Sequence, residues 1–239
     1  MVMHVTVPDV PKSPMTRCPG VVRLPRVAWD EITDTDELTA LFGTPSYRAA
    51  NKDRDALLPI HLEWLSMSPF CLIGTADDTG RCDVSPKGDP AGALVHVLDE
   101  TTLAIAERPG NKRMDGYRNV LLNPHVGINF FVPGRGDTLR INGGARLLKD
   151  APFFDDMKVK GHRPILCLLV DVEQVFFHCA KAFMRSRLWE PDTWNPSALP
   201  TVARITKAVM PDSPETLAEL EQYYGPSYEE QLYQRQQPQ

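Results

Sequence analysis

The feature that most limits how this chain can fold is a series of short apolar runs between Phe70 and Phe177, β-branched or alternating in character. Each run is bounded by residues that favour turns, as expected of strands. The seven runs are "FCLIGTAD", "RCDVSP", "ALVHVLD", "TTLAIAE", "HVGINFFVP", "TLRINGGARLL" and "ILCLLVDVEQVFF". The segments "DDTG" and "PGRGD" suit hairpin turns, and a single helical segment interrupts the series. This close spacing favours an antiparallel barrel or sandwich over β-α-β units.

The segments on either side of the strands predict an extended arm and helices. Five of the 22 prolines lie in the first 25 residues, which indicates an extended arm. "TDTDELTALFG" predicts a helix with a Thr or Asp cap that Gly43 closes, and "ALLPIHLEWLSMSP" predicts a second helix that Pro59 starts or kinks. The apolar face expected of the second helix consists of Leu57, Ile60, Trp64 and Leu65.

The end of the chain returns to helix and loop. In "SPETLAELEQYYGP", Ser213 is the expected N-cap and Pro214 the expected first helical residue. We therefore expect three parts: an arm with helices over residues 1–54, a barrel over residues 55–190, and a helical extension over residues 191–239.

Composition excludes several classes of partner. The chain is 42% hydrophobic and can bury a core, and its net charge of -5 gives no general attraction to nucleic acid or anionic membrane. No apolar run approaches the roughly 20 residues of a membrane span, and the N-terminal stretch lacks the apolar core of a signal peptide. Five scattered cysteines suit a reducing compartment, and the histidines show no zinc-ligand spacing. These features predict a cytoplasmic protein that binds small molecules and no metal.

The segment "RPGNKRMDGYRNVLLNP", residues 108–124, predicts a short helix with an unusual first turn. Asn111 is the expected N-cap, which places Lys112 and Arg113 at the positive end of the helix dipole, where acidic residues are usual. Free backbone N–H groups together with two cations suit a bound phosphate. The alternative is that both side chains point into solvent on a surface helix.

The segment "GRCDVSPKGDP" predicts a strand with one polar face. Arg81, Asp83, Ser85 and Lys87 are two residues apart and therefore project to the same side. The strand "TLRINGGARLL" likewise places Arg140 and Asn142 on one face, beside two glycines that allow close backbone approach. Both rows can be aimed into a site, or they can be the solvated outer face of an edge strand.

The residues just quoted carry a family resemblance. "FCLIGTADDTGRCDVSPKGDPAG" and "LAIAERPGNKRMDGYRNVLLNPHVGINFFVPGRGDTLRINGGARLL" resemble the FMN-binding split β-barrel of the pyridoxamine 5'-phosphate oxidase-like family. The similarity spans roughly residues 55–190, and "VFFHCAKAFMRSRLW" resembles the C-terminal part of one bacterial branch. The resemblance implies a mainly β fold with flanking helices (α+β), an antiparallel split barrel of Greek-key type.

The resemblance also implies a cofactor and its binding residues. In the family, residues at the start of the helix after the fourth strand bind the FMN phosphate, which corresponds here to Asn111, Lys112 and Arg113. A strand with an arginine and a lysine lies along the flavin, and backbone near Ile105 faces its rings. The strand residues implied here are Arg81, Ser85 and Lys87.

A homodimer follows from the same resemblance, with flavin at the interface and residues of both chains at each site. Arg140 is then a cofactor residue from the second subunit, and Arg185 and Trp189 are substrate residues, unless that pair serves core packing and surface charge instead. The C-terminal segment that binds substrate in the true vitamin B6 oxidase has no counterpart in the Gln-rich tail of this chain. The implied activity is thus an FMN-dependent oxidoreductase acting on another small molecule, with its catalytic residues unassigned.

Two alternatives stay open at this stage. The first is a non-catalytic protein that binds or stores flavin. The second is a barrel that accepts deazaflavin or haem in place of FMN. Haem would need an axial ligand such as His96, His125 or His178.

Overall fold

The structure, a computed structural model, describes residues 29–233. The chain divides into two compact units, residues 1–46 and residues 47–239. The described part of the first unit contains α1 (Thr35–Phe42), whose N-cap Asp34 accepts a 2.8 Å hydrogen bond from the Glu37 N–H. Gly43 ends α1 with a φ of 74°, so the predicted caps of this helix are confirmed. The predicted extended arm lies outside the described residues.

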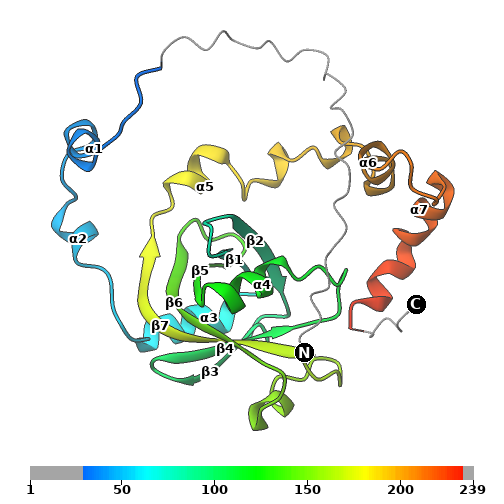
Figure 1. Ribbon diagram of the computed structural model, residues 1–239, viewed down its shortest axis with the longest axis horizontal. Coiled ribbons are helices and arrows are strands. Elements are labelled where there is room, and N and C mark those ends of the chain that lie inside the picture. Colours follow the sequence, from blue (N-terminus) through cyan, green and yellow to red (C-terminus); the bar gives the residue numbers. More distant parts are fainter. Residues whose placement is uncertain (1–28, 234–239) are drawn as a thin grey trace, which may run out of the picture. The chain divides into compact units, whose positions relative to one another are not determined.

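One seven-stranded antiparallel sheet forms the framework of the second unit (Figure 1). Its strands are β1 (Phe70–Ala76), β2 (Cys82–Gly88), β3 (Val95–Asp99), β4 (Thr102–Glu107), β5 (His125–Phe131), β6 (Thr138–Leu148) and β7 (Leu166–His178). The strand order is β2-β1-β5-β6-β7-β4-β3, with β2 and β3 as unpaired edges, so the sheet curves without closing. The predicted fold class, a mainly β antiparallel split barrel of Greek-key type with flanking helices, is confirmed.

The main core lies on the concave side of the sheet. Alternate residues of β1, β5 and β6 point inward, and their largest fully buried members are Ile128, Phe130, Leu139 and Ile141. Strand β4 is buried on both faces because a second cluster, around Phe154 and Met157, covers its outer side. Small side chains at Ala104 and Ala106 let that second cluster approach closely.

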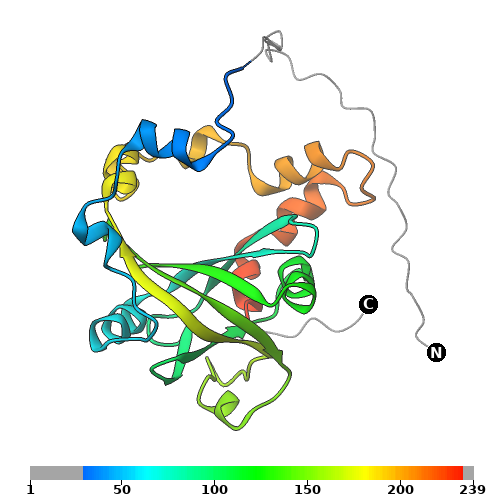
Figure 2. The same ribbon diagram turned by 60° about the vertical axis from the view of Figure 1, so that its left-hand side comes forward.

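Helices cover the ends of the curved sheet. The second unit contains α2 (Tyr47–Ala50), α3 (Pro59–Met67), α4 (Asp115–Leu122), α5 (Lys181–Ser186), α6 (Val202–Val209) and α7 (Leu217–Tyr223). Figure 2 shows α3 and α4 on opposite sides of the strands. No helix within residues 29–233 combines the length and the apolar character needed to cross a bilayer.

Two details of the predicted helices need correction. Pro59 starts α3, but Ile60 is 54% exposed and does not belong to its buried face, which comprises His61, Trp64 and Leu65. The C-terminal helix begins at Leu217 and not at Pro214, since Thr216 and Glu219 form a reciprocal capping box there. Ser213 still accepts a 3.4 Å hydrogen bond from the Glu215 N–H, in the turn that precedes the helix.

The paired strands β6 and β7 meet at an irregularity. Their register shifts between Asn142 and Gly143, which leaves Glu173 as the extra residue of β7. A Cβ atom on Gly143 would lie 1.9 Å from the backbone oxygen of Asp171. The close backbone approach predicted from the glycine pair is therefore confirmed at Gly143.

The reactivity of the cysteine thiols reports how deeply the strands of the sheet are buried. Burial raises the pKa of the Cys71 and Cys167 thiols to about 12, whereas a hydrogen bond from the Lys181 N–H lowers the pKa of the exposed Cys179. Because the thiolate is the reactive form, iodoacetamide at pH 8 should label Cys179 in the native protein and spare Cys71 and Cys167. Peptide mass spectrometry measures this. Equal labelling before and after denaturation would contradict the burial of β1 and β7.

Candidate functional site

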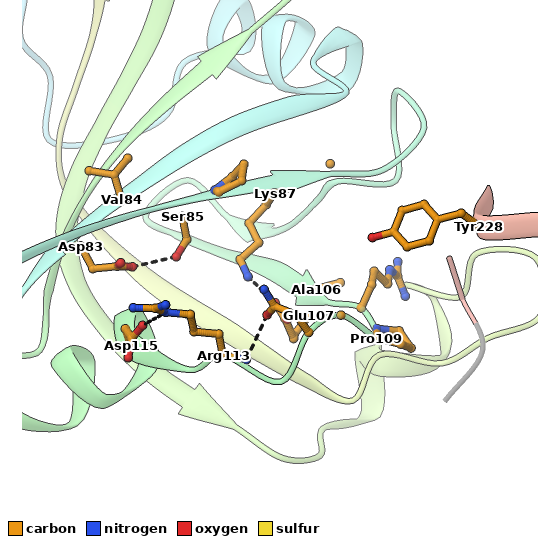
Figure 3. Close-up of a pocket in the computed structure, with 15 residues that line it drawn as sticks. Asp83, Val84, Ser85, Lys87, Ala106, Glu107, Pro109, Arg113, Asp115 and Tyr228 are labelled. Atoms are coloured by element: carbon orange, nitrogen blue, oxygen red, sulfur yellow. Dashed lines mark hydrogen bonds and ion pairs between the residues drawn. The ribbon is translucent and has the colours of Figure 1, made fainter. Parts of the chain in front are cut away.

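An open cavity of about 490 Å³ lies between β2 and the segment that connects β4 to α4 (Figure 3). Residues 83–88 form one wall, and residues from 106 to 115 form the other. Tyr228, far along the chain, adds a further side chain. The volume falls within the range of small-molecule sites, about 300–1,000 Å³.

The polar row on β2 faces this cavity. Asp83, Ser85 and Lys87 are partly buried, while Cys82 before them and Val84 and Pro86 between them are exposed, so the predicted alternation is confirmed. The row pairs with β1, where Ser85 lies opposite Ile73. Because β2 is an edge strand, its polar side chains reach the open margin of the barrel without being sealed into the core.

Lys87 belongs to a network that the sequence did not indicate. Its Nζ donates to Glu107 Oε2 at 2.5 Å, and the Tyr117 hydroxyl donates to the same oxygen. The Lys87 ammonium also lies 4.9 Å from the centre of the Tyr117 ring. Burial, followed by the Glu107 carboxylate, raises the pKa of Tyr117, so its hydroxyl keeps its proton. The Glu107 carboxylate accepts from both side chains and thereby holds Lys87 at the cavity wall.

The helix after β4 starts later than predicted. α4 begins at Asp115 with Met114 as N-cap, so Asn111, Lys112 and Arg113 lie in the preceding loop. Lys112 has a φ of 61°, which a continuous helix cannot contain, and Asn111 Oδ1 accepts a 3.0 Å hydrogen bond from the Arg113 N–H. Asn111 therefore caps a turn, and the first helical turn carries the usual acidic residue.

The start of α4 sits directly on the polar row. A Cβ on Gly116 would lie 3.2 Å from Asp83 Oδ2, and Asn119 donates to Thr75 Oγ1 at 3.1 Å. Ser85 donates to Asp83 at 2.8 Å. The carboxylates of Asp83 and Asp115 are thus the negative groups at the positive end of the helix dipole.

The cations of the cavity differ in how firmly they are held. Lys87 and its partner Glu107 are only 17% and 22% exposed at their side chains. Arg113 forms an ion pair with Asp115, but its side chain is 78% exposed. Because exposed ion pairs are screened by water and contribute little, an incoming anion can replace Asp115 at Arg113 at little cost.

A second cavity of about 310 Å³ lies along residues 107–114 with Tyr117, Ile165 and Leu166 in its walls. It includes Lys112, which does not line the first cavity. The loop 107–113 therefore separates two cavities and brings its basic residues to both.

Four of the predicted residues meet in the first cavity: Ser85, Lys87, Asn111 and Arg113. The others lie elsewhere within this chain. Arg81 is exposed in the turn before β2. The Ile105 side chain is buried in the main core, while the next two residues, Ala106 and Glu107, line the cavity. Arg140 lies 5.5 Å from the centre of the Phe176 ring.

The residues predicted to contact substrate also lie away from both cavities. Arg185 is exposed on α5. The Trp189 indole N–H donates to the Arg135 carbonyl at 2.7 Å, and its ring stacks on Phe183. Neither residue contributes to the walls of the two cavities described here.

The three histidines considered as haem ligands lie outside these walls as well. His96 stacks on Phe153 at 5.4 Å, and His125 lies 3.7 Å from Glu173. Burial and the nearby Arg140 and Lys52 lower the pKa of His178. No observation therefore favours an axial ligand in the cavity.

Comparison with known proteins agrees with the fold. The sequence profile of the pyridoxamine 5'-phosphate oxidase family matches residues 57–179, just over half of the 239-residue chain. None of the curated proteins searched matches the chain.

Three solved structures are similar to the chain, all with TM-scores below 0.5. A candidate pyridoxamine 5'-phosphate oxidase from Lactobacillus delbrueckii is 22% identical, with 52% of this chain and 98% of that chain covered and a TM-score of 0.41. A pyridoxamine 5'-phosphate oxidase-related, FMN-binding protein from Nostoc punctiforme is 15% identical, with coverages of 51% and 84% and a TM-score of 0.35. An F420 reductase is 19% identical, with coverages of 48% and 94% and a TM-score of 0.34.

Proposed function

Because the chain belongs to the pyridoxamine 5'-phosphate oxidase family, whose fold is a flavin-binding one, we propose that it is an FMN-dependent oxidoreductase acting on a small molecule. One observation carries the proposal: the polar row of β2 and the basic loop after β4, distant in sequence, line the same cavity. Ser85, Lys87, Asn111 and Arg113 are the residues that would hold FMN, with Lys112 beside them.

The donor set fits a phosphate-bearing ligand. The exposed Arg113 can exchange its partner Asp115 for a phosphate, and charge-assisted hydrogen bonds of this kind are among the strong ones. Bound FMN supplies hydride or electron exchange. The protein's own contribution is to orient the ligand. Glu107 holds Lys87 Nζ at the cavity wall, and the protonated Tyr117 hydroxyl donates a hydrogen bond to the same carboxylate.

We extend the proposal to a homodimer of the chain in the cytoplasm. Arg140, Arg185 and Trp189 lie away from the cavity of their own chain, which suits a role at the site of a second copy. On α4, Leu121 and Leu122 are 74% and 59% exposed, an apolar surface that a second subunit would cover. The division of the chain into three parts, with boundaries after residues 54 and 190, belongs to the same proposal.

The visible absorption spectrum of the purified protein, with mass spectrometry of any small molecule released by heat, tests the cofactor. A flavin band and the mass of FMN are expected. Reduction by NADH or NADPH and reoxidation by a substrate would then separate an oxidoreductase from a storage protein. A protein that takes up neither FMN nor deazaflavin would contradict the proposal.

Removing the carboxylate that competes for Arg113 should strengthen FMN binding. The Asp115→Asn variant is expected to bind FMN about two- to fivefold more tightly, since the exposed ion pair is weak and its loss leaves Arg113 available to the phosphate. Fluorescence titration of FMN measures the affinity.

Asp137→Asn is the matched control for this variant, because Asp137 pairs with Arg135 two residues away, outside the cavity walls. Its affinity should equal that of the wild type. Unchanged or weaker binding by Asp115→Asn would remove Arg113 from the phosphate site.

A further inference from the structure

Each of the three cations among the described residues that line the first cavity is paired with a carboxylate. The pairs are Lys87 with Glu107, Arg108 with Asp89, and Arg113 with Asp115. They differ in exposure, since the Arg113 side chain is 78% exposed, whereas the Lys87 and Glu107 side chains are only 17% and 22% exposed. Because charges interact more strongly where water is largely excluded, Lys87 and Glu107 determine each other's effect on a ligand in the cavity.

Three elements meet at the Glu107 carboxylate. Lys87 reaches it from β2 and Tyr117 reaches it from α4, while Glu107 itself is the last residue of β4. Lys87 Nζ donates to Glu107 Oε2 at 2.5 Å, and the Tyr117 hydroxyl donates to the same oxygen. Figure 3 shows the Lys87 side chain directed toward Glu107. The ammonium therefore has one defined position in the cavity wall, and Glu107 provides it.

Glu107 is also the group that balances the charge of Lys87. The 2.5 Å distance and the low exposure of both side chains make its carboxylate the principal counter-charge of the ammonium. Tyr117 cannot replace Glu107 in this respect, because burial and the nearby carboxylate raise the pKa of its phenol, which stays protonated and neutral. Removing one partner of a largely buried ion pair leaves the other charge uncompensated. Without Glu107, the cavity wall would present a free positive charge.

A charge at this position bears on the chemistry of a bound flavin. Charge beside the ring system is one of the means by which a protein tunes a flavin cofactor. Reduction adds electrons to the flavin, so a nearby positive charge stabilises the reduced form relative to the oxidised form. An ion pair has a much weaker field than a single ammonium, because its two charges oppose each other. The pair thus allows Lys87 to contact a ligand without strongly favouring the reduced flavin.

We propose that Glu107 is a positioning residue that fixes the Lys87 ammonium in the cavity wall and, by balancing its charge, lowers the reduction potential of the bound cofactor. The effect on the potential rests on the proposed function, since it requires FMN in the cavity. The position of Lys87 does not, because it depends only on side chains of the protein.

Trace acetylation of the flavin-free protein with acetic anhydride tests the positioning. Peptide mass spectrometry compares the acetylation of Lys87 with that of the exposed Lys149 in the same sample. Glu107→Gln should raise this ratio at least about fivefold, because the ammonium loses a charge-assisted hydrogen bond. Asp137→Asn is the matched control, since it removes a carboxylate from the ion pair with Arg135 outside the cavity walls. Its ratio should equal that of the wild type, and equal ratios in the two variants would overturn the positioning role.

The reduction potential of the bound FMN tests the charge balance. It is measured by slow reduction with dithionite in the presence of a reference dye, with which the flavin equilibrates. Glu107→Gln should raise the affinity for reduced FMN relative to oxidised FMN about 10-fold. This change corresponds to a potential about 30 mV more positive for a two-electron couple. Lys87→Met should move the potential in the opposite direction, and the double variant should return it toward the wild-type value.

Tyr117→Phe separates charge from hydrogen bonding. It removes a donor to the same carboxylate oxygen but removes no charge, so the ratio of the two FMN affinities should change less than about twofold. A shift in Tyr117→Phe as large as that in Glu107→Gln would overturn the role of charge, as would an unchanged potential in Glu107→Gln.

The two proposals fail separately. A wild-type protein that binds no flavin contradicts the proposed function, and the acetylation comparison then still tests Glu107 as the residue that holds Lys87. Normal FMN binding together with the same potential in the wild type and in Glu107→Gln contradicts the further inference alone.

Discussion

Gly143→Ala is expected to lower the free energy of unfolding by about 3 kcal/mol or more, because overpacking against rigid backbone is costly. The added Cβ would meet the Asp171 backbone oxygen at 1.9 Å and the Glu173 nitrogen at 3.2 Å. Neither atom can turn aside as a side chain can, so β6 and β7 must separate. Thermal unfolding should show a midpoint lower by about 6–12 °C for a chain of this size.

Gly144→Ala is the matched control at the next residue. Its Cβ would lie 3.7 Å from a Glu173 side-chain oxygen, an ordinary contact distance. Its unfolding free energy should stay within about 1 kcal/mol of the wild type. Similar midpoints for the two variants would contradict the register of β6 and β7 at the bulge.

The double variant Lys112→Ala/Arg113→Ala is expected to bind FMN at least about 100-fold more weakly, since each charge-assisted hydrogen bond to phosphate is worth roughly 1.5–3 kcal/mol. Both side chains are exposed, so the thermal midpoint of the flavin-free protein should change little. Fluorescence titration and thermal unfolding together separate lost binding from lost folding.

The control for this pair is Arg146→Ala/Lys158→Ala, which removes the same charge from two exposed ion pairs outside the cavity walls. Its FMN affinity should match that of the wild type. Equal affinity in both double variants would return Lys112 and Arg113 to the role of surface charges.

The loop before α4 was predicted only in part from the sequence. The pattern predicted a helix and a basic anion site, and both Asn111 and Arg113 do line the cavity. The predicted N-cap, Asn111, lies three residues before the observed N-cap, Met114, because nothing in the local pattern indicates the positive φ of Lys112. The acidic partners of the dipole, Asp83 and Asp115, come from a different strand and from the helix itself.

Residues missed entirely belong to contacts between distant segments. Glu107 ends a strand and Tyr117 lies on a short helix, so neither has a sequence signal of its own. Their link to Lys87 exists only because β2 and β4 face each other across the open margin. Tyr228 lines the cavity from far along the chain.

The sequence by itself determined the seven strands, the caps of α1 and the alternation of polar and other residues along β2. These follow from periodicity and from backbone preferences within a few residues. The tertiary structure decided which charges are paired, which predicted residues share a cavity and which aromatic side chain lines it. Those outcomes depend on strand order and packing, because residues far apart along the chain must meet before their interactions can stabilise the fold.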